Sequence, residues 1–361
     1  MVRVTVPVPG RPYDVTIGAG LLRDLGEHIP DLPGATTAFV ISDRTVADLH
    51  HATVARAIED RGLASVLLLV PEGEEAKSLQ AYESLLRQLA GREAHRDDAV
   101  LALGGGAVGD LAGFVASTYM RGVPFLQVPT TLTAQVDAAI GGKTAVNLPE
   151  GKNLVGTFTQ PVAVLADVEA LATLDERDFR SGLAEVAKYA LTLDPDLLGM
   201  LERDPGPVVR RDAAVLEDVI ARCVAAKARI VAADERDASA RLVLNYGHTL
   251  GHALERLDSF RGRTHGEAVA HGMVFAAALA ESRGLAPGLR ARTERLLGSL
   301  GIAPDGDLPP VDELLHCVRL DKKYRDGVRW VLLGDAGRPI VVDDVSDQEV
   351  AAALHEMGAP A

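Results

Sequence analysis

The chain contains little of what marks several large classes of protein. It has only two cysteines among 361 residues, too few for a disulfide framework. No apolar run approaches the roughly 20 residues that a membrane-spanning helix needs, and the N-terminus lacks the long apolar core of a signal peptide. The net charge of −14 argues against general affinity for nucleic acid or for anionic membranes. We therefore expect a cytoplasmic protein whose partner is a small molecule.

The apolar residues that are present follow two different patterns. In the first half, short apolar runs alternate with helix-length stretches, which predicts a parallel sheet covered on both faces. These runs lie at 37–41, 65–70, 99–103 and 125–128. Beyond about residue 175 the patterns are helical, with one short strand pair near 328–342. The helical stretches lie at 179–191, 208–233, 246–258, 266–283 and 288–300. The sequence thus predicts an α/β, Rossmann-like domain over residues 1–174 and a mostly α-helical domain over 175–361.

A glycine-rich loop follows the third apolar run. Gly104, Gly106 and Gly109 satisfy the G-x-G-x-x-G pattern between an expected strand and an expected helix. Glycine has no side chain, so the backbone can approach a pyrophosphate group closely, and the N-terminus of the following helix favours its negative charge. The acidic residue usual about 20 positions later is missing, and Asp43, after an earlier strand, is the candidate for binding a ribose hydroxyl. The alternative is a tight strand–helix turn that binds no ligand.

Two Gly-Lys pairs, ending at Lys143 and Lys152, lie close together in the middle of the chain. Flexible backbone beside ammonium groups suits a phosphate ester. Each pair alone is explained equally well as an ordinary turn with a solvated lysine. Together with Thr130, Thr131 and Asp137, they favour a binding surface.

Two helical histidines, a third histidine and a glutamate form a candidate metal site. His248 and His252 are four residues apart, so a helix places them on one face, and His265 follows. Glu185 lies in a largely apolar helical stretch, where an unpaired carboxylate is costly to bury. Glu185, His248 and His265 make a catalytic zinc set with one position open. Such histidines also bind polyanions or pack between helices, and spacing alone leaves these alternatives open.

These segments, in this order, resemble the 3-dehydroquinate synthase family. The matching stretches include GGGAVGDLAGFVASTYMRG at 104–122, PTTLTAQVDAAIGGKTAVN at 129–147, GKNLVGTF at 151–158, AEVAKY at 184–189 and RLVLNYGHTLGHALE at 241–255. The resemblance implies an NAD-binding N-terminal domain, a metal-binding helical C-terminal domain and a place in the shikimate pathway. It also implies conversion of 3-deoxy-D-arabino-heptulosonate 7-phosphate to 3-dehydroquinate and phosphate. In this family NAD oxidises a hydroxyl, phosphate is eliminated, the ketone is reduced again, and an intramolecular aldol step closes the ring.

The resemblance also implies roles for individual residues. The residues implied to contact NAD are Asp43, Glu74, Lys77, Gly106, Ala107, Val108, Gly109, Asp110, Thr130, Thr131, Asp137, Lys143, Lys152 and Thr173. The implied ligands of Zn²⁺ or Co²⁺ are Glu185, His248 and His265. The implied phosphate contacts are Lys143, Asn153, Asn245, His252 and one of Lys322 and Lys323. Arg121 is implied to reach the phosphate bound by the neighbouring subunit of a homodimer. The residues implied to hold the substrate carboxylate and nearby hydroxyls are Lys188, Lys227 and Arg241.

The chain departs from the family pattern at a few positions. Asp237 stands four residues before Arg241, where the family usually has the longer glutamate, which puts fine positioning of the substrate in doubt. Ala138 and Ala139 replace serines.

The nearest alternative function is another sugar phosphate cyclase, of the aminodehydroquinate, valiolone or inosose type. Lys227 and Arg241, matched to a carboxylate-bearing substrate, favour dehydroquinate synthase over the last two types. A more distant alternative is a metal-dependent polyol dehydrogenase, which would accumulate NADH.

Overall fold

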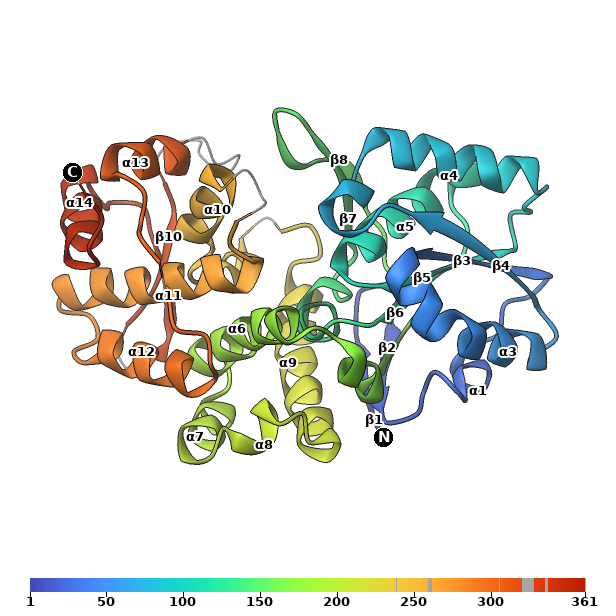
Figure 1. Ribbon diagram of the computed structural model, residues 1–361, viewed down its shortest axis with the longest axis horizontal. Coiled ribbons are helices and arrows are strands. Elements are labelled where there is room, and N and C mark those ends of the chain that lie inside the picture. The colour runs from blue at the N-terminus through green and yellow to red at the C-terminus, as the bar shows by residue number, and fades with distance from the viewer. Residues whose placement is uncertain (238, 259–261, 305, 320–327, 335–336, 361) are drawn as a thin grey trace. The chain divides into compact units, whose positions relative to one another are not determined.

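The computed structural model describes residues 1–361 except 238, 259–261, 305, 320–327, 335–336 and 361. Lys322 and Lys323, of which one is implied to bind phosphate, lie outside the described residues. Contacts divide the chain into two compact units, both drawn in Figure 1. The first comprises Met1–Asp175 and Arg211–Arg236, and the second comprises Glu176–Arg210 and Asp237–Ala361.

A seven-stranded sheet forms the centre of the first unit (Figure 1). Its order is β1-β2-β9-β6-β5-β3-β4, and all neighbouring strands are parallel except β1 with β2. The strands are β1 (Val2–Val6), β2 (Tyr13–Gly18), β3 (Thr37–Asp43), β4 (Ala64–Val70), β5 (Ala99–Gly104), β6 (Phe125–Pro129) and β9 (Ala163–Asp167). The four apolar runs of the sequence are β3, β4, β5 and β6. The predicted parallel sheet is therefore confirmed.

Both faces of this sheet are apolar because successive side chains of a strand point to opposite faces. In β5, Val100 and Ala102 pack into one core, and Leu101 and Leu103 pack into the other. Helices α4 (Leu79–Gly91) and α5 (Gly106–Thr118) contribute to the first core. Helices α1 (Leu25–His28) and α3 (Ala52–Asp60) contribute to the second. Burial on both faces explains why these strands are continuous apolar runs.

The strand order reverses between β3 and β5. The chain runs from β3 outward to β4, and then returns to place β5 on the other side of β3. Ligands of open α/β sheets bind beyond the carboxyl ends of the strands at such a reversal. Asp43 ends β3 and Gly104 ends β5, so both lie at this point.

Several further elements complete the first unit. An antiparallel hairpin pairs β7 (Lys143–Leu148) with β8 (Gly151–Phe158). Helix α9 (Ala213–Ala233) packs against β1 and β2, so residues 211–236 lie in the first unit, although their sequence position assigned them to the second domain. The short helices are α2 (Arg44–Val46), η1 (Ala47–His51), η2 (Gly73–Ala76), η3 (Tyr119–Arg121), η4 (Ala134–Ala138) and η5 (Val168–Thr173).

The second unit is mainly helical, as predicted. Its helices are α6 (Glu176–Thr192), α7 (Pro195–Arg203), α8 (Gly206–Val209), η6 (Ala240–Asn245), α10 (His248–Leu257), α11 (His265–Ser282), α12 (Leu289–Ser299), α13 (Val311–Arg319) and α14 (Asp347–Glu356). Helix α11 is the most deeply buried and packs against α6, α10, α12 and α14. The predicted strand pair is the antiparallel hairpin of β10 (Trp330–Leu333) and β11 (Pro339–Val342). Among the described helices of the chain, none has the length and apolar character needed to cross a bilayer.

Candidate active site

The first histidine of the expected metal set opens helix α10. Gly247, just before it, has a left-handed backbone with a φ of 80°, which glycine adopts without strain. The Nδ1 atom of His248 lies 3.1 Å from the carbonyl oxygen of Tyr246. A carbonyl only accepts hydrogen bonds, so Nδ1 carries the proton and Nε2 keeps its lone pair. His248 thus presents Nε2 as a metal ligand.

The second histidine opens helix α11, where Thr264 and Glu267 form a capping box. His265 directs Nε2 at Glu185 Oε1, 3.1 Å away, and Nδ1 at Glu255 Oε2, 3.4 Å away. A carboxylate on the second ring nitrogen of a metal-binding histidine sets its tautomer and orientation. Glu255 was not among the residues predicted from the sequence. Glu255 follows His248 by seven residues and so lies on the same face of the helix, and this spacing was the sequence signal that could have identified it.

Glu185 of α6 joins the two imidazoles. Its side chain is 1% exposed, and Oε1 lies 3.4 Å from Nε2 of His248 and 3.1 Å from Nε2 of His265. Its other oxygen, Oε2, pairs with Lys188, one turn further along α6. One ligand atom from each of Glu185, His248 and His265 lies within 4.8 Å of the others. Two imidazole nitrogens and a carboxylate oxygen suit Zn²⁺ or Co²⁺, so these residues fit the implied metal.

The protonation states of this cluster are set by burial and by its charges. Burial acts to raise the pKa of Glu185, but Lys188 and His248 outweigh it and hold that pKa well below its ordinary value. Burial and the nearby Lys188 lower the pKa of His248 to about 4. Burial also acts to lower the pKa of His265, but hydrogen bonds with Glu185 and Glu255 raise it to about 10. Glu185 and His248 are therefore in their ligand forms at neutral pH, and a metal would displace one proton from His265.

Glycines allow the two helices that carry the histidines to pack closely. A Cβ atom at position 272 in α11 would lie 1.8 Å from the carbonyl oxygen of Gly247. A Cβ atom at position 251 in α10 would lie 3.2 Å from the carbonyl oxygen of Ala268. Gly272 and Gly251 thus let α10 approach α11 at backbone distance, which brings the rings of His248 and His265 within 5.3 Å of each other, centroid to centroid.

A small pocket adjoins the metal cluster on the side of His252. The ring of His252 meets that of His248 edge to face, with 5.5 Å between centroids. The pocket is lined by Leu242, Asn245, His248, Thr249, His252, Arg329, Val331 and Val341. It brings together the predicted phosphate residues Asn245 and His252 with the predicted metal ligand His248. The exposed Arg329 adds a cation that the sequence motifs did not indicate.

In the first unit, the glycine loop lies where the sequence predicts it. Gly105 caps α5, which begins at Gly106 directly after β5. A Cβ atom at Gly109 would lie 2.6 Å from the side-chain oxygen of Gln127, and one at Gly106 would lie 3.2 Å from Ala138. The carboxylate of Asp43 accepts a hydrogen bond from the backbone N–H of Val46, 2.9 Å away. Burial raises the pKa of Asp43.

The structure joins several predicted nucleotide and phosphate residues of the first unit into one polar network. The ammonium group of Lys77, which is 5% exposed, donates to Asp110 and to the side-chain oxygen of Asn153. Asn153 has a left-handed backbone, with a φ of 55°, and its N–H donates to Asn147. Asn147 in turn donates to Glu74, which lies 3.4 Å from the ammonium group of Lys152. Asn147, which no motif singled out, thus links the two halves of this network.

The other predicted residues of the first unit are more dispersed. Lys227 of α9 donates to the carbonyl oxygen of Asp137 at 2.8 Å and pairs with its carboxylate at 3.0 Å. Thr130 and Thr131 follow β6, and the hydroxyl of Thr131 accepts from the N–H of Ala134. The remaining positions are Lys143 at the start of β7, Thr173 at the end of η5 beside His50, Ala107 and Val108 in the first turn of α5, and the exposed Arg121. In the second unit, Arg241 of η6 is 3% exposed, and Asp237 has a φ of 56°.

Models of known protein families match most of this chain. The model of the 3-dehydroquinate synthase N-terminal domain matches residues 67–181, and that of the C-terminal domain matches residues 182–324. The 3-dehydroquinate synthase of Symbiobacterium thermophilum is 46% identical over 94% of this chain and 96% of its own length. That of Pelobacter propionicus is 43% identical over 96% of this chain and 97% of its own length.

Solved structures share the fold over nearly the whole chain. A 2-deoxy-scyllo-inosose synthase, in complex with carbaglucose-6-phosphate, NAD⁺ and Co²⁺, has a TM-score of 0.87 and 29% identity, and covers 98% of this chain and 99% of its own. The 2-epi-5-epi-valiolone synthase of Streptomyces hygroscopicus, with NAD⁺ and Zn²⁺, has a TM-score of 0.86 and 29% identity, and covers 96% of each chain. An iron-containing alcohol dehydrogenase, at 15% identity, a TM-score of 0.67 and coverage of 96% of this chain and 97% of its own, shares the fold alone. The family models and the full-length relatives together show that this chain belongs to the 3-dehydroquinate synthase family.

Proposed function

We propose that the chain converts 3-deoxy-D-arabino-heptulosonate 7-phosphate to 3-dehydroquinate and phosphate. The observation that carries this proposal is the second unit's Glu185, His248 and His265 beside a pocket that contains Asn245 and His252. The reaction oxidises one carbon and expels phosphate from the carbon two positions away, so it requires a metal-binding set close to a phosphate-binding set. The relatives at 43% and 46% identity that carry this name support the same reaction.

The chain has residues for both implied cofactors. Glu185, His248 and His265 would hold Zn²⁺ or Co²⁺, and the glycine loop with Asp43, Glu74 and the Lys77 network would hold NAD. When bound, the metal supplies Lewis-acid polarisation of a hydroxyl and NAD accepts and returns a hydride. Two solved relatives contain both cofactors: the inosose synthase binds NAD⁺ and Co²⁺, and the valiolone synthase binds NAD⁺ and Zn²⁺.

The remaining residues are assigned to the substrate's two anionic groups. Asn245 and His252 donate hydrogen bonds to the phosphate, and Arg329 adds a charge to the same pocket. Lys188 and Arg241, both buried in the second unit, are the cations assigned to the carboxylate there. Lys227, buried in the first unit, keeps the carboxylate role that the family resemblance implies. Lys188 already pairs with Glu185 and Lys227 with Asp137, so anions of the chain itself compensate these two buried cations and hold them in place.

The test is a single assay with two readouts. Purified protein with NAD, Zn²⁺ and the heptulosonate phosphate should release phosphate while NADH absorbance stays at baseline, because the hydride returns to the substrate. A chelator should stop phosphate release, and added Zn²⁺ or Co²⁺ should restore it. NADH that accumulates in proportion to turnover would instead identify a polyol dehydrogenase. Phosphate release only from sugar 6- or 7-phosphates without a carboxylate would identify an inosose or valiolone cyclase.

We also propose that the enzyme is a cytoplasmic homodimer that binds neither nucleic acid nor membrane. Leu154 and Phe158 are 44% and 40% exposed on β8, whose partner strand among the described residues is β7. Burial of these side chains against a second copy of the chain would remove this apolar surface from water.

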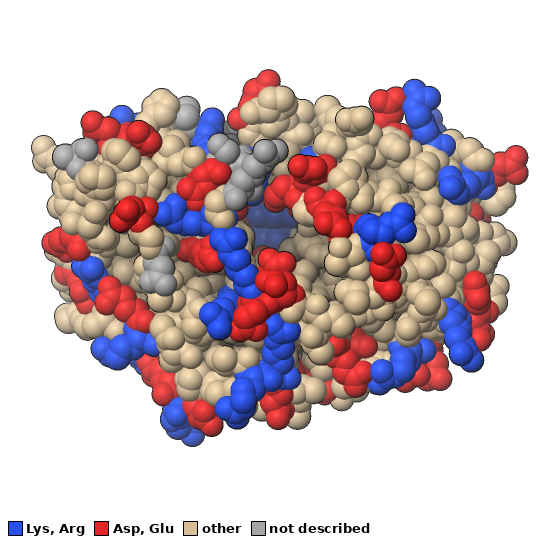
Figure 2. Space-filling model, in the orientation of Figure 1, with Lys and Arg blue, Asp and Glu red and all other residues tan. Residues whose placement is uncertain are grey.

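On the face drawn in Figure 2, acidic side chains lie among the basic ones, as expected of a chain that carries a net charge of −14. The buried thiols of Cys223 and Cys317 suit a reducing compartment.

A further inference from the structure

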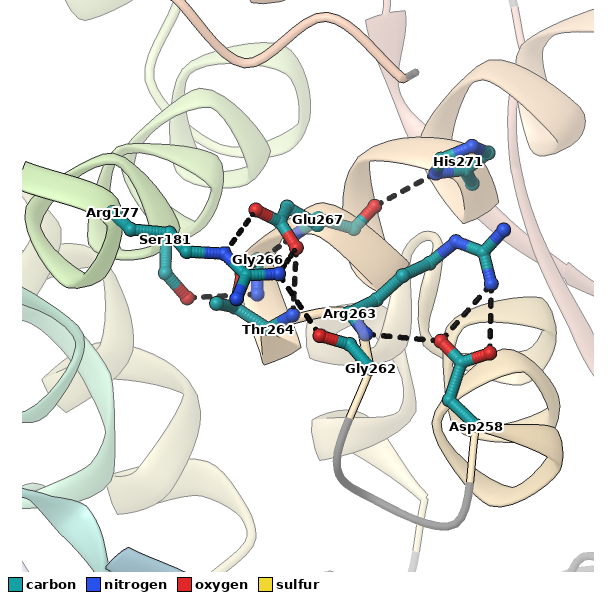
Figure 3. Close-up of polar contacts among 9 residues, drawn as sticks. All are labelled: Arg177, Ser181, Asp258, Gly262, Arg263, Thr264, Gly266, Glu267 and His271. Carbon is teal, nitrogen blue, oxygen red and sulfur yellow. Dashed lines mark hydrogen bonds and ion pairs between the residues drawn. The ribbon is translucent and has the colours of Figure 1, made fainter. Parts of the chain in front are cut away.

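A bidentate ion pair between Arg177 and Glu267 lies at the start of α11 (Figure 3). His265, the proposed metal ligand, is the first residue of the same helix. Arg177 of α6 donates from Nε to Oε1 of Glu267 and from Nη2 to Oε2, each at 2.8 Å. The same Nη2 donates to the carbonyl oxygen of Gly262 at 2.9 Å. One guanidinium group therefore holds the chain both before and after His265.

The backbone on either side of His265 is held by side chains. The N–H of Thr264 donates to Glu267 Oε2 at 2.8 Å, and the N–H of Glu267 donates to the hydroxyl of Thr264 at 3.2 Å. The N–H of Gly266 donates to the hydroxyl of Ser181 at 2.9 Å. A Cβ atom at Gly266 would lie 2.2 Å from the carbonyl oxygen of Ser181, so α6 and α11 touch at this residue. The first turn of α11 is thus docked on α6.

The residues of α6 that make these contacts share a stripe with a metal ligand. Arg177, Ser181 and Glu185 are spaced at four-residue intervals, so they lie on one face of the helix. At 1.5 Å per residue, the stripe from Arg177 to Glu185 is about 12 Å long. Two of its residues bind the chain around His265, and the third lies 3.1 Å from the His265 ring. Helix α6 therefore sets the distance between the carboxylate ligand and the imidazole ligand.

We propose that Arg177 and Glu267 are positioning residues for the metal ligand His265. Metal–nitrogen distances in a working site fall within about 0.2 Å of their ideal values. A shift of the first turn of α11 along α6 would move His265 relative to Glu185 and weaken metal binding. Because Arg177 is 58% exposed, its ion pair contributes little to folding by itself. The inference rests on the proposed metal site.

The chain offers a matched control for this pair. Arg292 and Glu202, also in the second unit, form a bidentate ion pair at 2.6 and 2.9 Å, with side chains 47% and 34% exposed. This pair contacts none of the predicted ligands. Arg292→Gln removes a surface ion pair of the same kind and so reports the structural effect alone.

The experiment measures zinc affinity by competition with a chelator, the absorption spectrum of the Co²⁺ form, and the thermal midpoint of the metal-free protein. Arg177→Gln and Glu267→Gln should lower zinc affinity about 10- to 100-fold, the effect typical of residues that orient metal ligands. Glutamine still closes a capping box, so the loss in Glu267→Gln comes from the ion pair. Arg177→Lys keeps the charge but not the bidentate contact, so its zinc affinity should lie between those of the unaltered chain and Arg177→Gln. The Co²⁺ bands should shift, and the thermal midpoint should change no more than in Arg292→Gln.

Three outcomes would overturn the proposal, and the last is distinguishable from the first two. If both Arg177→Gln and Glu267→Gln change zinc affinity by less than about two-fold, the scatter of ordinary surface substitutions, then the pair is only structural. The same conclusion follows if Arg292→Gln loses as much affinity. If the unaltered chain binds zinc no better than His248→Ala, the metal site itself is refuted, and the positioning role falls with it.

Discussion

Two histidines one turn apart on α10 have different neighbours. His248 lies 3.4 Å from Glu185 and lines the metal cluster, whereas His252 lies in the pocket with Asn245. Spacing on the helix places both on one face and leaves either free to be the ligand. The position of Glu185, on another helix, separates them.

The separation predicts different losses on substitution. His248→Ala should lower zinc affinity by more than about 100-fold, because loss of a ligand exceeds the 10- to 100-fold effect of an outer residue. His252→Ala should keep its zinc and release phosphate more slowly, because it loses a contact to the leaving group. Metal content after dialysis and initial rates of phosphate release measure the two effects. Equal zinc loss in both variants would show that the roles are wrongly divided.

At the scale of elements, the site depends on how closely α10 and α11 pack. Gly272 of α11 lies against the carbonyl group of Gly247, immediately before the proposed metal ligand His248. A side chain at this crossing must push the start of α10 away. The crossing therefore fixes the position of His248 in the proposed metal site, although neither glycine has a functional group.

Gly272→Ala tests this packing. The added methyl group would lie 1.8 Å from the Gly247 oxygen, and overpacking of this kind costs about 1–3 kcal/mol. Gly199→Ala, in α7, is the control, because nothing lies within 4 Å of the added atom. A helical glycine replaced by alanine without a clash gains about 0.5–1 kcal/mol. The midpoint of urea denaturation should fall in Gly272→Ala and rise in Gly199→Ala. A shift of both midpoints in the same direction would contradict the crossing argument.

At the scale of the whole molecule, the first question is whether two copies of the chain complete each other's sites. Arg121 is exposed and has a left-handed backbone, with a φ of 67°, in the turn before β6. An exposed arginine with a strained backbone is suited to a role at an interface. In the proposed homodimer it reaches the phosphate bound by the neighbouring subunit.

Mixing two inactive variants tests this arrangement. Arg121→Ala lacks the contributed arginine and His248→Ala lacks the metal, but a heterodimer of the two contains one complete site. Unfolded together and refolded, they should regain about a quarter of the unaltered activity, since half of the randomly formed C₂ dimers are heterodimers with one complete site each. Arg121→Ala mixed with the double variant should regain none. No gain in the first mixture would refute the shared site.

Much of the fold was predictable because it depends on short-range patterns. The runs that became β3, β4, β5 and β6 are apolar because both faces of a parallel sheet are buried. Helix α9 is the exception, since its sequence pattern predicts a helix but does not say which unit the helix joins. Its contacts with β1 and β2 place it in the first unit.

The sequence by itself determined the kinds of element and the position of the glycine loop, because periodicity and helix capping act over a few neighbouring residues. The residues proposed to bear the chemistry followed mainly from the resemblance to the 3-dehydroquinate synthase family. Only the tertiary structure decided which of them meet. Glu185 and His265 are 80 residues apart, and Arg177 and Glu267 are 90 apart, yet each pair is in contact. Asn147 and Glu74, 73 residues apart, are likewise in contact. Contacts over these separations arise from the packing of whole helices, which local spacing does not encode.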